Sequence, residues 1–182
     1  MKTTNAALIA ELEDYVKRHR EKALELRSMP VQALSNSPKP GAWCALECIE
    51  HLNRYGRFYL PEIKKRLGER RSASANSNFR STWLGEYFAH SVKDKPKLNT
   101  MNTFANMNPS GSTLTGEVID EFIEQQEALL GLLKQCLLTD LVKTRTSISI
   151  SKWIRLRLGD TLRVLIYHND RHMAQAFRAV CN

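Results

Sequence analysis

Two histidines near the end of the chain have a spacing that suits metal binding. His168 and His172 stand four residues apart. In a helix, both imidazoles would project from one face, because four residues turn through about 40° more than a full circle. One helix could then offer both rings to the same metal ion. Asn169 stands where an HExxH helix carries its general-base glutamate, so the zinc-protease mechanism is not indicated.

A third histidine, His51, lies far upstream in a stretch that also reads as a helix. An imidazole on the inward face needs a hydrogen bond or a metal, because burying it without a partner is costly. Three neutral imidazoles would leave coordination positions open, which is typical of a catalytic rather than a structural metal site. We therefore predict that His51, His168 and His172 bind one divalent metal ion. No general base or other catalytic residue is indicated.

Apolar residues at three- and four-residue steps predict four long helices, over residues 4–27, 43–67, 116–138 and 159–180. Asp160 is the expected N-cap of the last helix. Four amphipathic helices with almost no strand signal predict an all-α fold, a four-helix bundle built by residues 1–182 as a single domain.

Two connections are less regular. Residues 68–113, between the second and third long helices, predict a long crossover, a lid, or both, with a polar loop at 72–78 and a short helix at 83–90. Residues 147–151 alternate like a strand but have no obvious partner, so we expect an extended edge segment.

Other residues have a structural and a functional interpretation. Glu47 could bond to His51, or it could complete a capping box with Cys44. Gln126 interrupts an apolar stripe and is a candidate to line a pocket near Tyr55 and Phe58.

The two remaining histidines are not predicted ligands. We interpret His19 as a core residue with one hydrogen bond, and His90 as a loop residue without a visible partner.

Composition restricts the function classes. The formal charge is +8 and the pI is about 9.5, and residues 64–71 are the most basic segment. We interpret this segment as a solvated helix end rather than a specific nucleic-acid site, since no aromatic interleaving or known motif accompanies it. The four cysteines have no zinc-knuckle spacing and predict reduced thiols in a cytoplasmic protein. Neither an export signal nor a membrane-spanning run is evident.

Two motifs resemble those of the DinB-like superfamily. Residues 43–52, WCALECIEHL, resemble the W-S-x-x-E-x-x-x-H-L opening of its second helix, with Cys44 where serine is common. Residues 168–175, HNDRHMAQ, resemble its H-x-x-R-H-x-x-Q signature, and residues 158–162, LGDTL, resemble the usual lead-in. The resemblance implies up-down-down-up topology, a nickel or zinc site whose ligands fall on His51, His168 and His172, and frequent homodimers. It gives no reason to expect DNA binding.

Two functions follow as hypotheses. The first is a metal-dependent hydrolase or thiol-dependent transferase that acts on a small molecule, with a low-molecular-weight thiol as a possible second substrate. The DinB-like superfamily also includes members without known activity. The second hypothesis is therefore a non-enzymatic helical bundle that binds a small molecule or a protein, with the histidines as hydrogen-bonded polar residues.

Overall fold

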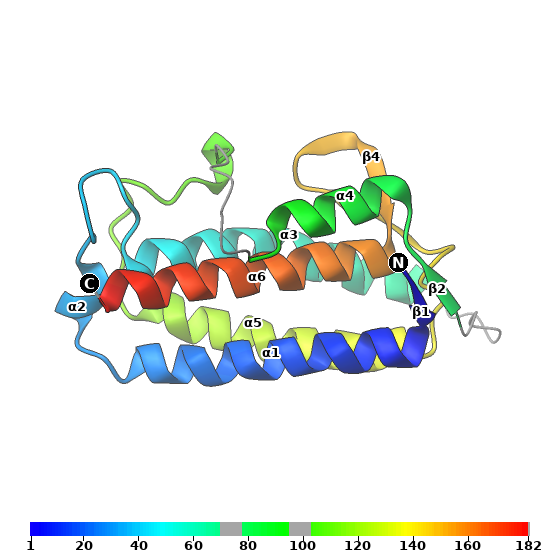
Figure 1. Cartoon of the computed structure of the whole chain (residues 1–182), viewed down its shortest axis with the longest axis horizontal. Helices are drawn as coiled ribbons and strands as arrows, with labels where there is room; N and C mark the ends of the chain where they lie inside the picture. The colour runs from blue at the N-terminus through cyan, green and yellow to red at the C-terminus, as the bar shows by residue number, and fades with distance from the viewer. Residues whose placement is uncertain (70–77, 95–102, 182) are drawn as a thin grey trace.

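Four long helices make up most of the computed structural model, which describes residues 1–69, 78–94 and 103–181. They are α1 (Asn5–Arg27), α3 (Ala45–Glu69), α5 (Glu117–Cys136) and α6 (Leu158–Val180). They lie side by side, with α1 and α6 running one way and α3 and α5 the other (Figure 1). α1 and α3 each pack against both α5 and α6. The predicted all-α class is confirmed, and each long helix begins and ends within two residues of its expected bounds.

Shorter elements connect or flank these helices. They are α2 (Val31–Ser35), α4 (Trp83–Val92), a 3₁₀ turn η1 (Ala105–Met107), and the strands β1 (Lys2–Thr4), β2 (Asn78–Arg80), β3 (Arg145–Ile148) and β4 (Ser151–Arg157). The short helix expected at 83–90 is confirmed as α4, which packs along α6 (Figure 1). Most of the polar loop expected at 72–78 lies outside the described residues.

The core has two apolar clusters with a polar level between them. One contains Leu12, Ile63 and Leu165, and the other contains Leu26, Ile49 and Met173. Near the boundary of the clusters, each long helix buries a polar side chain: His19, His51, Gln126 and Asn169. Burying polar groups in mid-core is costly unless they are bonded. We therefore expect these four buried polar side chains to form hydrogen bonds or to belong to a functional site.

The prediction that residues 147–151 lack a partner strand is wrong. β3 and β4 form an antiparallel hairpin in which Thr146 lies opposite Leu156, with an irregularity between Ser147 and Ile148. The hairpin packs beside α3, where the Ser147 N–H donates to a carboxylate oxygen of Glu62 at 2.8 Å. The alternation of apolar and polar residues along β4 is hard to recognise in the sequence, because an apolar side chain occupies an outward position. That side chain is Trp153, which is 94% exposed.

The expected N-cap role of Asp160 is also wrong. Helix α6 begins at Leu158, so Asp160 lies in its first turn and is fully buried. Its carboxylate accepts hydrogen bonds from the Thr82 N–H at 3.1 Å, the Thr82 hydroxyl at 3.0 Å and the Ser81 hydroxyl. Asp160 therefore fastens the start of α4 to α6.

The basic segment behaves in part as expected. Arg66 forms ion pairs with Glu62 and Glu69, both at 2.9 Å, within its own helix end. Arg70 and Arg71 lie outside the described residues. Among the helices that the structure describes, none is long and apolar enough to cross a membrane.

Candidate metal centre

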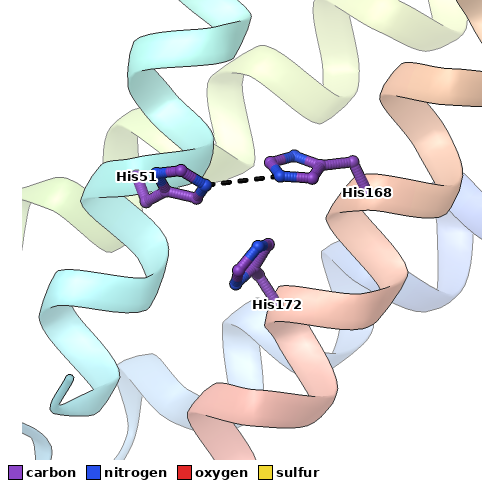
Figure 2. A group of neighbouring side chains, drawn as sticks. All are labelled: His51, His168 and His172. Atoms are coloured by element: carbon purple, nitrogen blue, oxygen red, sulfur yellow. Dashed lines mark hydrogen bonds between the residues drawn. The ribbon is translucent and has the colours of Figure 1, made fainter. Parts of the chain in front are cut away.

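The three predicted ligands meet between α3 and α6. His51 projects from α3 toward His168 and His172, which project from successive turns of α6 (Figure 2). Their ring centroids are 4.6–5.0 Å apart. One potential ligand atom from each ring lies within 4.8 Å of the other two, and the Nε2 atoms of His51 and His168 are 3.3 Å apart. The structure therefore brings together the residues that the sequence singled out.

Two of these rings are oriented by hydrogen bonds at Nδ1, the ring nitrogen that points away from the other histidines. The Nδ1–H of His51 donates to the backbone carbonyl of Met107 at 2.7 Å. The Nδ1–H of His172 donates to the side-chain oxygen of Gln175 at 2.9 Å. A proton on Nδ1 leaves the Nε2 lone pair free, and such outer partners typically fix the tautomer of metal-binding histidines. The Nδ1 atom of His168 is buried and has no hydrogen-bond partner among the residues that the structure describes.

Burial keeps the three imidazoles neutral at ordinary pH. It lowers the pKa of His51 to about 4 and that of His172 to about 3. The pKa of His168 is lowered for the same reason, and then by its histidine neighbours. His51 is 2% exposed, whereas the other two residues keep partial exposure, although most of each ring is desolvated. Three neutral nitrogen donors fit a divalent ion such as zinc or nickel.

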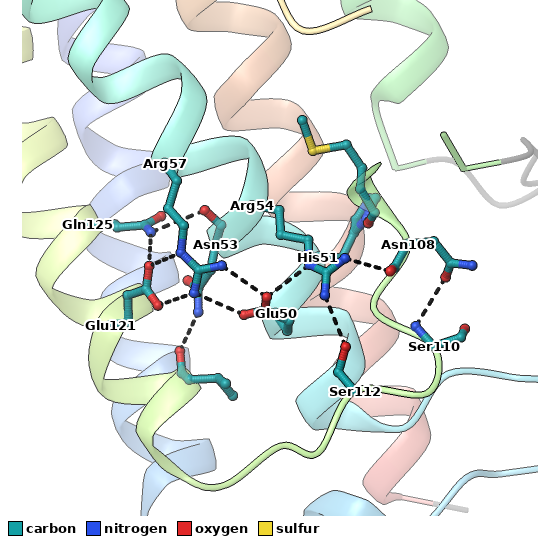
Figure 3. Close-up of polar contacts among 12 residues, drawn as sticks. Glu50, His51, Asn53, Arg54, Arg57, Asn108, Ser110, Ser112, Glu121 and Gln125 are labelled. Atoms are coloured by element: carbon teal, nitrogen blue, oxygen red, sulfur yellow. Dashed lines mark hydrogen bonds and ion pairs between the residues drawn. The ribbon is translucent and has the colours of Figure 1, made fainter. Parts of the chain in front are cut away.

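An arginine network holds the chain that orients His51 (Figure 3). Arg54 donates to the backbone carbonyl of Asn108 at 2.6 Å and to the hydroxyl of Ser112 at 3.0 Å. Its Nε–H also donates to Glu50 at 2.9 Å. The residues that follow Met107 are thereby held against α3. The role of Met107 could not be predicted from the sequence, because any residue type can supply a backbone carbonyl. The i,i+4 spacing of Glu50 and Arg54 was the feature of the sequence that indicated part of this network.

The two interpretations of Glu47 can now be separated. Its carboxylate accepts from the backbone N–H of Cys44 at 2.9 Å, as in a capping box. Tyr55 lines the cavity beside the histidines, as expected. Phe58 and Gln126 are not among the residues that line it; Gln126 is buried and donates to the carbonyl of Phe122 at 3.4 Å.

The remaining histidines have other partners. His19 is fully buried and its Nε2 lies 3.3 Å from a carboxylate oxygen of Asp170, in agreement with its interpretation as a core residue. The expectation for His90 is wrong, because it lies on α4 and its Nε2 is 3.0 Å from Glu86. Glu86 and His90 have i,i+4 spacing within the short helix expected at 83–90, so the sequence did carry the signal for this pair.

The structure is a mostly helical protein with a three-histidine group that could hold a metal ion. A family model described as the DinB superfamily matches residues 15–176. The chain belongs to the DinB superfamily. Neither the curated proteins nor the solved structures contain a match to it.

Proposed function

We propose that this chain is a metal-binding member of the DinB superfamily, a four-helix bundle of up-down-down-up topology in which His51, His168 and His172 hold one divalent ion. The observation that carries this proposal is the convergence of three ligand atoms within 4.8 Å, two of them on rings already oriented by Nδ1–H hydrogen bonds. Zinc and nickel are the favoured ions, since both accept imidazole nitrogen.

The proposed reaction is hydrolysis or thiol transfer on a small molecule. An ion with three protein ligands has open positions, where it supplies Lewis-acid chemistry to water or to a thiol. The chain itself supplies a cavity of about 160 Å³ beside the histidines. Burial raises the pKa of Tyr55, which lines this cavity, to about 12. Its hydroxyl therefore keeps its proton at neutral pH and can serve as a hydrogen-bond donor to a substrate.

A non-enzymatic binding protein is the second candidate. The 3.3 Å contact between the Nε2 atoms of His51 and His168 can be a hydrogen bond without a metal. The cavity, which is mainly lined by apolar side chains, would then bind a ligand beside hydrogen-bonded histidines. Metal content separates the two candidates.

The test is metal analysis of protein purified without an affinity metal. The chain is compared with the triple variant His51→Ala, His168→Ala, His172→Ala after equal exposure to zinc or nickel. His90→Ala is the matched control, because His90 is an exposed histidine on α4. We expect about one ion per chain in the parent and control, and none in the triple variant. Equal metal in all three proteins would refute the proposed centre.

A further inference from the structure

The cavity next to the histidines has a mainly apolar wall. Side chains from α4, α6 and the β3–β4 hairpin enclose it, including those of Phe88, Val92, Ile148, Leu156, Val164 and Leu165. Ile148, Leu156 and Leu165 are themselves buried. The cavity volume is about 160 Å³. A cavity of about 150 Å³ can hold a benzene-sized ring, so this wall suits a ligand body of that size.

Among the described residues that line the cavity, permanent charge has one sign. Arg171 is the only residue with a permanent charge among the described residues that line it, and no aspartate or glutamate is among them. The guanidinium donates to the carbonyl of Ser91 at 3.4 Å, and Asp94 lies close enough to favour its charged form. The Arg171 side chain is only partly exposed, so its guanidinium is a partly desolvated cation. An anion that accepts charge-assisted hydrogen bonds stabilises such a cation.

Helix geometry places this cation beside the candidate metal centre. Arg171 follows His168 by three residues and directly precedes His172 on α6. Residues three apart on a helix are neighbours on its surface. Arg171, His168 and His172 all line the same cavity. A ligand that reaches Arg171 with one group is therefore within reach of the histidines.

We propose that the cavity binds a small anionic molecule with a ring-sized apolar body, which packs against the α4, α6 and hairpin wall while its carboxylate or similar group pairs with Arg171. The proposal assigns a substrate class. It rests on the proposed function, because it takes the three histidines as the part of the site where the ligand reacts. Arg171 is a binding residue in this arrangement, and the apolar wall excludes water around the ligand.

Matched probes test the charge requirement. Phenylacetate and 2-phenylethanol share a phenyl body and differ in charge, and their dissociation constants can be measured by NMR titration of chelator-treated protein. We expect phenylacetate to bind at least about tenfold more tightly, as one charge-assisted contact provides. Arg171→Gln should reduce this preference to within about twofold, whereas Arg171→Lys should retain part of it.

Arg178→Gln is the control, since it removes the same charge from an exposed position on the same helix. It should leave the preference intact. Equal binding of both probes, no binding of either, or an Arg171→Gln variant that keeps the full preference would overturn the proposal.

Metal-free protein separates this inference from the proposed metal centre. An Arg171-dependent preference would support the anion site even if the triple histidine variant retained as much metal as the parent. Equal binding of the two probes by protein that does load metal at the three histidines would reject the anion site alone.

Discussion

The Nε2 atoms of His51 and His168 face each other at 3.3 Å, although the two residues are 117 positions apart in the chain. His51 donates its Nδ1–H to Met107, so its neutral ring presents a lone pair at Nε2. Without a metal, His168 must therefore carry its proton on Nε2 to make this contact favourable. A shared divalent cation would instead need both lone pairs, and His168 would then carry its proton on Nδ1.

This relationship predicts a tautomer change at His168. Long-range ¹⁵N–¹H correlation spectra should show an Nε2–H tautomer in metal-free protein and an Nδ1–H tautomer after zinc is added. His51 should remain an Nδ1–H tautomer in both states, because its bond to Met107 does not involve Nε2. An unchanged His168 spectrum in zinc-saturated protein would contradict the shared-ion arrangement.

Gln175 should affect metal affinity without binding the ion. Its side-chain oxygen accepts the Nδ1–H of His172, so Gln175→Leu frees that ring to rotate and to change tautomer. We expect a loss of about 10- to 100-fold in zinc affinity, which is typical for outer partners of metal-binding histidines. Competition with a chromogenic chelator measures this change.

The control for this substitution is Gln135→Leu, which alters an exposed glutamine on α5. Its zinc affinity should match that of the parent. A Gln175→Leu protein with parental affinity and an intact fold would show that the His172–Gln175 bond does not support the site.

The positions of the long helices and the inward placement of the three histidines can be predicted from periodicity. Leu8, Leu12 and Val16 recur at helical steps because one face of α1 must be buried, and the same rule places His168 and His172 on one side of α6. Helical periodicity also places His51 on the inward face of α3, and the resemblance of the two motifs supports the same three residues. Local spacing and family pattern were sufficient here because these residues lie within long helices.

Contacts between distant segments could not be read in this way. Asp160 looks like an N-cap from its neighbours, yet its partners are Ser81 and Thr82, which lie about 80 positions away. Similarly, the carbonyl of Met107 accepts from His51 in a segment whose following residues are held against α3 by Arg54. Such contacts depend on how the crossover folds back, and no local periodicity encodes that path.

Two helical glycines should respond in opposite ways to alanine. A methyl group at Gly159 would come within 2.4 Å of the ring of Phe79, which is buried. Gly159→Ala should therefore lower the free energy of unfolding by about 1–3 kcal/mol through overpacking. Gly131 is exposed on α5, and no described residue outside its own helix backbone lies within 4 Å of an added methyl group. Gly131→Ala should raise the free energy of unfolding by about 0.5–1 kcal/mol.

Urea unfolding monitored by circular dichroism measures both changes. A Gly159→Ala protein that is as stable as the parent would mean that the Gly159–Phe79 contact does not limit the volume at the start of α6.

Glu86 should make stability sensitive to acid. Hydrogen bonds from Arg163, one of them 2.9 Å long, lower the pKa of Glu86 from 4.5 to about 2. Since the folded state binds this proton more weakly than the unfolded state, the stabilisation is complete above pH 4.5 and is lost as the pH falls toward 2. Glu86→Gln should be less stable at neutral pH and should lose less stability across that interval.

The urea midpoint of unfolding, measured from pH 6 to pH 2.5, follows this effect. Glu127→Gln, which alters an exposed carboxylate paired with Arg20, serves as the control and should follow the parent curve. Parallel curves for Glu86→Gln and the parent would contradict a special role for the Arg163–Glu86 pair.

The most direct test of the account is a crystal structure of the protein grown with zinc, with anomalous diffraction recorded on both sides of the zinc edge. We predict one anomalous peak between α3 and α6, with the Nε2 atoms of His51, His168 and His172 at about 2.0–2.1 Å from the ion. Zinc-containing crystals without a peak at this position would contradict the three-histidine metal centre.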